Sequence, residues 1–223
     1  MTSVAPRALI VLLDGTELAG TARQRIRSLR VAARLDQPTQ AELVLATTAG
    51  PGAFDPEVRP GTTLDVRLVD HADALFGGEV TAVEVEYAAD GAAILRLRAY
   101  DPLHRLRKRQ GLRVFTSVTA VELARELCGA VGLEVTAEVD GPRLERLSQH
   151  RHSDLELLRE VAGRAGLHLA ADGDGVRLVT LAGYGEPVAL TLGAGVHTLR
   201  LSTNTDQASG ASAALGWHPS GPR

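Results

Sequence analysis

The chain has 223 residues, of which 44% are hydrophobic and 23% are charged, a balance typical of folded globular proteins rather than disordered ones. Its formal net charge is only −3, which argues against a general attraction to nucleic acid or anionic membranes. Its single cysteine, Cys128, excludes an intrachain disulfide and a multi-cysteine zinc site, and we expect it to be a buried apolar residue. The length is sufficient for two compact domains.

The apolar run near the N-terminus is short. It extends from Ala8 to Leu13 and ends at Asp14-Gly15, which is too short for the apolar region of a signal peptide or for a membrane span. We therefore expect a chain that does not bind membranes itself and that is made and assembled in the cytoplasm.

Residues 1–101 show the period-two alternation of antiparallel strands, interrupted by Gly, Pro and Asp turn signals. A loop is expected between Gly50 and Gly61. The alternation predicts a sheet with one buried and one solvated face. The apolar positions expected on the buried face are Leu29, Val31, Ala33, Leu35, Leu64, Val66 and Leu68.

The clearest hairpin extends from Val80 to Tyr100. Its charged residues all occupy even positions. Charged residues of the two strands can therefore stand directly opposite each other, on one face, only if the loop has an odd number of residues. With a loop centred near Gly91, the predicted register pairs Glu86 with Arg96 and Glu84 with Arg98.

Residues 102–182 change to a helical period and predict a small α/β module. Thr119 to Glu122 and Ser153 to Glu156 are capping boxes, each followed by an apolar stripe that ends at a glycine. Short strands are expected around the two helices. The segment Asp172-Gly-Asp-Gly175 resembles the start of a calcium loop but lacks the later glutamate, so a hairpin turn is favoured.

Residues 183–223 return to strand-like alternation at 188–192 and 196–201, then pass through a small-residue stretch to Gly216-Trp-His-Pro219. About forty residues cannot close a barrel of their own. We expect the apolar residues of these strands to contact a neighbouring chain or further sequence; they are Val188, Leu190, Leu192, Leu199 and Leu201.

The sequence contains no phosphate-binding loop, nucleophile elbow or metalloprotease helix motif, so we predict no catalytic residues, no cofactor and no metal. The histidines at 150, 152 and 168 lack the spacing of zinc ligands. A basic segment at 104–113 contains Arg105, Arg107, Lys108 and Arg109, which we also name as interaction residues. It has no interleaved aromatic residues, so a domain junction is favoured over a nucleic-acid site.

The order of several motifs resembles the VgrG and phage late control D family of spike-hub proteins. These motifs are Phe76-Gly-Gly-Glu-Val-Thr-Ala-Val83, the hairpin, Arg98-Ala-Tyr-Asp-Pro-Leu103, Arg113-Val-Phe115, the helix from Thr119, and Gln149 four residues before Ser153-Asp-Leu155. The resemblance covers about residues 5 to 219, and it lies in the order and spacing of motifs that are individually common.

This resemblance implies a mainly β fold with an α/β insertion: a tube-like antiparallel β-barrel domain at 1–101, the inserted module at 102–182, and the first strands of a second tube-like domain at 183–223. It implies a homotrimer that connects a hexameric inner tube and the baseplate to a trimeric spike in a phage tail, a type VI secretion system or an extracellular injection particle. The implied partners are the inner tube protein, baseplate subunits and the spike tip, without nucleic acid. Family members continue beyond the point where this sequence ends.

Two alternative functions remain open at this point. One is a spike-associated cell-wall hydrolase, whose candidate residues would be His150, His152, Asp154 and His168. The other is a nucleic-acid-binding module that uses the basic segment 104–113, whose affinity would fall steeply with salt.

Overall fold

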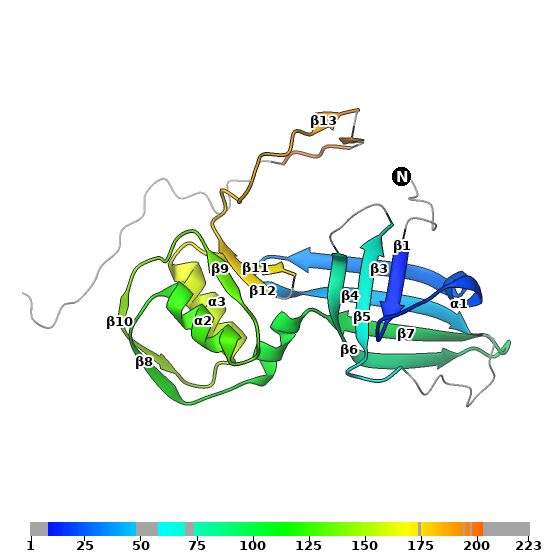
Figure 1. Cartoon of the computed structure of the whole chain (residues 1–223), viewed down its shortest axis with the longest axis horizontal. Coiled ribbons are helices and arrows are strands. Elements are labelled where there is room, and N and C mark those ends of the chain that lie inside the picture. Colours follow the sequence, from blue (N-terminus) through cyan, green and yellow to red (C-terminus); the bar gives the residue numbers. More distant parts are fainter. Residues whose placement is uncertain are drawn as a thin grey trace, which may run out of the picture. The chain divides into compact units, whose positions relative to one another are not determined.

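The structure is a computed structural model that describes residues 9–47, 58–69, 74–173, 175–193, 195–196 and 198–202. Two compact units, Met1–Tyr184 and Gly185–Arg223, make up the chain. The first unit contains a seven-stranded sheet followed by an α/β module (Figure 1). The predicted loop from Gly50 to Gly61 lies largely outside the described residues, as does the motif at 216–219.

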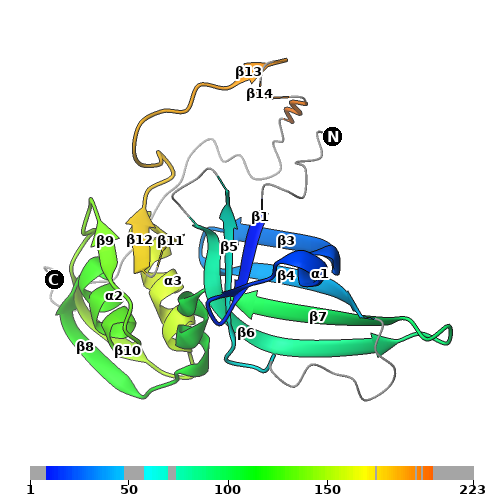
Figure 2. The ribbon, with the colours of Figure 1, turned by 45° about the vertical axis from the view of Figure 1, so that its right-hand side comes forward.

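The seven-stranded sheet has the order β2-β1-β5-β6-β7-β4-β3, and every neighbouring pair is antiparallel. A short helix, α1, joins β2 to β3. Figures 1 and 2 show β1 and β5 crossing over β3, β4 and β7, so the sheet folds over onto itself around one core. The mainly β, antiparallel fold with few helices is as predicted. The elements are β1 (Leu9–Leu13), β2 (Thr16–Glu17), α1 (Gly20–Gln24), β3 (Ile26–Arg34), β4 (Gln37–Thr47), β5 (Thr63–Leu68), β6 (Ala74–Tyr87) and β7 (Ala93–Tyr100).

Strand β6 belongs to both layers of the folded sheet. Its first half pairs with β5 up to Glu79, and its second half pairs with β7 from Glu79 onward. Gly78 lies where the strand passes over the end of β7: a Cβ atom at this position would stand 2.3 Å from the carbonyl oxygen of Tyr100 and 2.7 Å from the Cζ atom of Phe76. Only glycine fits this close approach of two backbones.

The core between the layers consists of aliphatic side chains from both halves and one phenylalanine. Leu64 and Val66 are fully buried, as their alternation predicted. Ala33 and Leu35 are exposed, however, so the prediction that they share the buried face is wrong. The register of β3 shifts between Ala32 and Arg34, and the β3–β4 turn follows at once. The buried core residues are Val11, Ala41, Leu43, Leu45, Val58, Leu64, Val66, Phe76, Val80, Leu95, Leu97 and Ala99.

The β6–β7 hairpin is present, but its predicted register is wrong by two residues. Glu84, rather than Glu86, stands opposite Arg96. The loop does contain an odd number of residues, but its centre is Asp90, because Gly91 adopts a left-handed conformation with φ +83° after the turn rather than at its midpoint. Arg96 forms its ion pair with Glu42 of β4, at 3.1 Å.

The α/β module contains two helices and five strands, after a 3₁₀ helix η2. Both predicted capping boxes are formed: Thr119 and Ser153 accept the N–H groups of Glu122 and Glu156, whose carboxylates accept the N–H groups of the caps in return. A three-stranded sheet has the order β11-β12-β9, and β8 pairs with β10. The elements are η2 (Pro102–Lys108), β8 (Arg113–Val118), α2 (Ala120–Gly129), β9 (Val135–Ala137), β10 (Leu144–Gln149), α3 (Asp154–Arg164), β11 (His168–Asp172) and β12 (Gly175–Val179).

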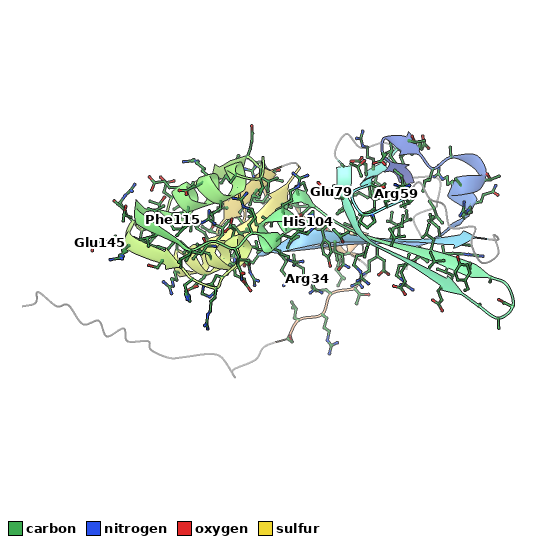
Figure 3. All side chains as sticks on the ribbon, turned by 90° about the horizontal axis from the view of Figure 1, so that it is seen from below. Arg34, Arg59, Glu79, His104, Phe115 and Glu145 are labelled. Atoms are coloured by element: carbon green, nitrogen blue, oxygen red, sulfur yellow. The ribbon has the colours of Figure 1, made fainter. Side chains whose placement is uncertain are left out.

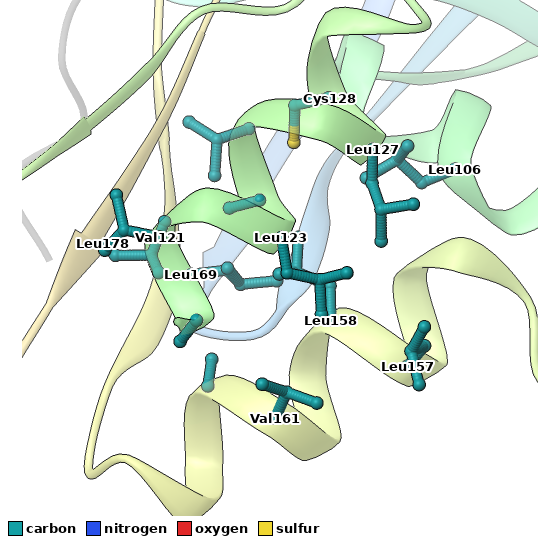
Figure 4. Packing of buried hydrophobic residues seen from close by; sticks show 14 of the residues in the cluster. Leu106, Val121, Leu123, Leu127, Cys128, Leu157, Leu158, Val161, Leu169 and Leu178 are labelled. Atoms are coloured by element: carbon teal, nitrogen blue, oxygen red, sulfur yellow. The ribbon is translucent and has the colours of Figure 1, made fainter. Parts of the chain in front are cut away.

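The core of the module lies between α2, α3 and the strands (Figure 4). Leu123, Leu127 and Leu158 are fully buried there. Cys128 is also fully buried, as predicted, and burial raises the pKa of its thiol to about 12. The β11–β12 connection is the expected hairpin turn, with Asp172 paired to Gly175 and Gly173 at a positive φ.

In the second unit, the described residues contain two short paired strands, β13 (Thr191–Leu192) and β14 (Gly195–Val196). These are shorter than the strands predicted at 188–192 and 196–201. None of the helices in the described part of the chain is long and apolar enough to cross a membrane.

Candidate interaction surfaces

Among the described residues, three sets of polar contacts join the α/β module to the seven-stranded sheet. The first involves the basic segment. Arg105 of η2 forms an ion pair with Glu79 of β6 and also donates to the carbonyl oxygen of Val131. The imidazole of His104 is buried, with its Nδ1 atom 2.7 Å from the carbonyl oxygen of Asp101 (Figure 3). This part of the basic segment therefore joins β6 to the α/β module through contacts within the chain.

The second contact is made by Asp101, which follows β7 and is almost fully buried. Its carboxylate accepts the N–H of Thr39 at 2.7 Å and the N–H of Leu103 at 3.0 Å, so it caps η2 and also holds β4. Burial raises the pKa of the Asp101 carboxyl, although these hydrogen bonds and nearby His104 act in the opposite direction.

The third contact joins the β3–β4 turn to β11. Asp36, at the turn, has a positive φ of 62°. Its carboxylate accepts the N–H of Leu169 at 2.9 Å and lies 2.7 Å from Nδ1 of His168, while its own N–H donates to the carbonyl oxygen of Leu169. The turn thus docks on the backbone and one side chain of the module's sheet.

Asp154 organises the interior of the module. Its side chain is fully buried at the start of α3 and receives hydrogen bonds from Arg109, Arg113 and the amide of Gln149. Gln149 is itself fully buried and also donates to the carbonyl oxygen of His152. The motif of Gln149 and Asp154 therefore connects the end of the basic segment to the second capped helix.

The four basic residues predicted to interact with partners fall into two groups, with and without an ion pair among the described residues. Arg105 and Arg109 form ion pairs within the chain, whereas Arg107 and Lys108 are exposed. Arg107 stacks over the ring of Tyr100, with its Cζ atom 5.3 Å from the ring centroid.

Arg107 borders a groove on the polar face of the seven-stranded sheet, which we call the basic groove. The groove has a cavity volume of about 220 Å³, and three arginines stand around it with one glutamate. That glutamate, Glu42, is bound by Arg96. The lining residues are Arg30, Ala32, Arg34, Gln37, Pro38, Gln40, Glu42, Tyr100 and Arg107.

The five apolar residues predicted to be contact residues in the second unit are all exposed. Their exposed fractions are at least 60%, and Leu201 reaches 85%. Exposed aliphatic side chains are expected of contact residues, but the contact itself stays a prediction. The residues are Val188, Leu190, Leu192, Leu199 and Leu201.

The residues considered for a hydrolase have separate structural surroundings. Asp154 is enclosed by two arginines, His168 contacts Asp36, and His150 and His152 are exposed. Within the described ranges, no group of three or more His, Cys, Asp or Glu side chains is arranged to hold a metal ion.

Sequence reasoning missed Asp36, Glu79 and Asp101 as the residues that fasten the module to the sheet. Glu79 and Asp101 lie within motifs that carry the family resemblance, and Asp101-Pro102 is a recognisable helix start. Asp36 gave no signal beyond that of a turn residue, since its partners are more than 130 positions away in the chain.

Comparison with known protein families identifies the chain. Residues 33–220 match the family described as the phage tail baseplate hub (GPD). The chain belongs to this family. The predicted relationship to VgrG and late control D hub proteins is thereby confirmed, and the family is a structural one. The chain matches no curated protein sequence.

Solved structures of tail and secretion proteins share the fold. A 43 kDa tail protein of prophage MuSo2 from Shewanella oneidensis is 16% identical with a TM-score of 0.63, and the match covers 77% of this chain and 52% of that protein. A tail protein from Neisseria meningitidis is 14% identical with a TM-score of 0.59, over 77% of this chain and 50% of that one. An Escherichia coli component of the type VI secretion system, described as similar to the T4 tail proteins gp27 and gp5, is 14% identical with a TM-score of 0.54, over 72% and 50%. The chain thus spans about half the length of these proteins.

Proposed function

We propose that the chain is a structural hub subunit of a contractile injection machine, which connects the inner tube and baseplate to the spike. The observation that carries the proposal is the match of residues 33–220 to the baseplate hub family. The proposed assembly is a homotrimer within a phage-tail-like particle or secretion apparatus, put together in the cytoplasm. Its proposed partners are the inner tube protein, baseplate subunits and the spike tip.

The exposed apolar residues of the second unit support this proposal. A hub needs surfaces that become buried only on assembly, and Val188, Leu190, Leu192, Leu199 and Leu201 present exposed aliphatic side chains, of which only Leu192 lies on a strand. We propose that residues 1–101 and 183–223 belong to two tube-like domains, with residues 102–182 as a module inserted between them.

The polar residues of the first unit also favour a structural role over an enzymatic one. The buried carboxylates Asp101 and Asp154 have their hydrogen-bond capacity taken up by backbone N–H groups and arginines of the same chain. A buried acid held in this way positions elements of its own chain. Arg105 and Arg109 are engaged similarly, which weakens the nucleic-acid alternative.

Deletion of the chain from its host tests the proposal. The expected result, seen by negative-stain electron microscopy, is the loss of complete particles, with tubes or sheaths that lack an attached spike. A plasmid copy of the chain should restore them. Normal, complete particles in the deletion strain would contradict a hub role.

A further inference from the structure

Among the described residues of the first unit, no ion pair neutralises the arginines of the basic groove. Arg30, Arg34 and Arg107 are exposed, and no carboxylate of the described residues lies within ion-pair distance of any of the three. Glu42, the one acidic residue of the lining, is already bound by Arg96. The chain as a whole has a net charge of −3, so this cluster of arginines is a local feature of one surface.

The opposite end of the same sheet carries the complementary charge. In the β6–β7 hairpin, residues 82–92 contain Glu84, Glu86 and Asp90, all exposed, and no basic residue, while Arg96 of β7 stands opposite Glu84. We call this segment the acidic hairpin. Half of the surface of Tyr87, beside these acids, is also exposed.

The groove and the hairpin cannot meet within one molecule. Strand β7 begins at the acidic hairpin with Ala93 and ends at the groove with Tyr100. At about 3.4 Å per residue, the two ends of β7 are about 24 Å apart, and even Glu84 and Arg30 are separated by the strands β7 and β4 of one continuous sheet. The backbone register places Glu84 on the same face as Arg96, Glu42 and Arg30, so both charged sites belong to the polar face of the sheet.

We propose that the acidic hairpin of one copy of this chain docks against the basic groove of a second copy. Such a contact is heterologous, because two different surfaces meet, and repeated contacts of this kind close into a ring when the rotation between copies permits. The inference rests on the proposed hub function and names the residues by which neighbouring copies recognise one another.

Carboxylates fit the groove better than nucleic acid does. The guanidinium groups of Arg30 and Arg34 are suited to bidentate contacts with carboxylates, and the amides of Gln37 and Gln40 add donors between them. The one aromatic ring of the lining, Tyr100, has Arg107 over one of its faces, where a base would otherwise stack.

Charge-reversal variants of the full 223-residue chain test the contact. The hairpin variant is Glu84→Arg with Glu86→Arg. The groove variant is Arg34→Glu with Arg107→Glu, which leaves Arg30 beside Glu42 untouched. The association of each is measured by sedimentation velocity at low and at high ionic strength, and melting temperatures verify that each variant is folded.

The wild-type chain is expected to associate, and more strongly at low ionic strength. Each variant alone should associate about tenfold more weakly, since like charges then meet at the contact. An equimolar mixture of the two variants should recover association, because the basic hairpin of one then faces the acidic groove of the other. A control variant, Arg125→Glu with Arg146→Glu, changes the net charge by the same amount as the groove variant on exposed positions of the module, and should behave as wild type.

A wild-type chain that stays monomeric, hairpin and groove variants that associate like the control, or a mixture that does not recover association would each overturn this contact. None of these results would disturb the hub proposal, which the host deletion tests independently. If both variants keep wild-type association while the groove variant alone loses binding to a short single-stranded DNA, the groove is a nucleic-acid site instead.

Discussion

Replacement of Gly78 by alanine tests the argument that β6 folds the sheet over the end of β7. The backbone of Gly78 does not have a positive φ, so alanine is conformationally allowed and only space opposes it. The new Cβ atom would stand 2.3 Å from the carbonyl oxygen of Tyr100 and 2.7 Å from its carbonyl carbon. Relief of this overlap requires a backbone shift of about 1 Å, because carbon atoms in contact normally stand at about 3.5 Å.

Forced overpacking of this kind costs about 1–3 kcal/mol, and we expect the upper end because the atoms in the way belong to the backbone rather than to a flexible side chain. For a domain of this size, a loss of about 3 kcal/mol lowers the melting temperature by about 6–12 °C. Urea unfolding of the full chain measures the free-energy loss and thermal unfolding measures the melting temperature, both monitored by circular dichroism.

Gly77→Ala is the matched control. Its Cβ atom would meet only the side-chain oxygen of Asp65, at 3.4 Å, an ordinary contact. We expect this variant to stay within about 1 kcal/mol of wild type, since loss of backbone freedom in the unfolded chain favours alanine slightly. Equal stability of the two variants would refute the steric argument and the proposed reason for glycine at position 78.

Four further predictions concern the α/β module and its junction. Ser153→Ala should lower the free energy of unfolding by about 1 kcal/mol through loss of the cap, whereas the exposed Ser148→Ala should not; equal effects would mean that the capping box contributes nothing. Asp154→Ala should cost about 3 kcal/mol in urea unfolding, because it removes the carboxylate that two arginines and a buried glutamine share, and a loss under 1 kcal/mol would contradict this. Cys128 should react with a thiol reagent only after unfolding, since burial raises its pKa to about 12; rapid labelling of the folded chain would argue against a buried thiol. Burial raises the pKa of the Asp101 carboxyl, so the folded chain keeps the carboxyl proton to higher pH than the unfolded chain does. Between the two pKa values, this group therefore makes the free energy of unfolding fall as pH rises. An NMR titration midpoint at or below that of an ordinary aspartic acid would contradict the shift.

Local sequence signals predicted the helices of the module well. The boxes at Thr119 and Ser153 are complete within four residues, so the sequence alone defines both partners of each hydrogen bond. The hairpin from Val80 to Tyr100 was also predicted from local signals, the alternation of its strands and the glycine of its turn. Its register, however, depended on the position of that glycine in the turn. Gly91 supplies the left-handed residue after the turn, and this places the loop centre on Asp90.

Long-range contacts were beyond such reasoning. Asp36 and His168 meet across more than 130 positions, and nothing near Asp36 distinguishes it from any other turn residue. The basic segment illustrates the same limit, because its charges alone did not separate Arg105, which is paired with Glu79, from exposed Arg107. The resemblance of motif order did predict the family, because that signal spans most of the chain.

A hub subunit lies at the centre of an injection particle, where the tube meets the spike. Cryo-electron microscopy of particles purified from the host through an affinity tag on the chain would show whether this chain lies there. We expect three copies of the chain around the particle axis, between the tube and the spike, with the fold of residues 9–184 recognisable in the density. Density for the chain elsewhere in the particle, or purification of the tagged chain without any particle, would contradict it.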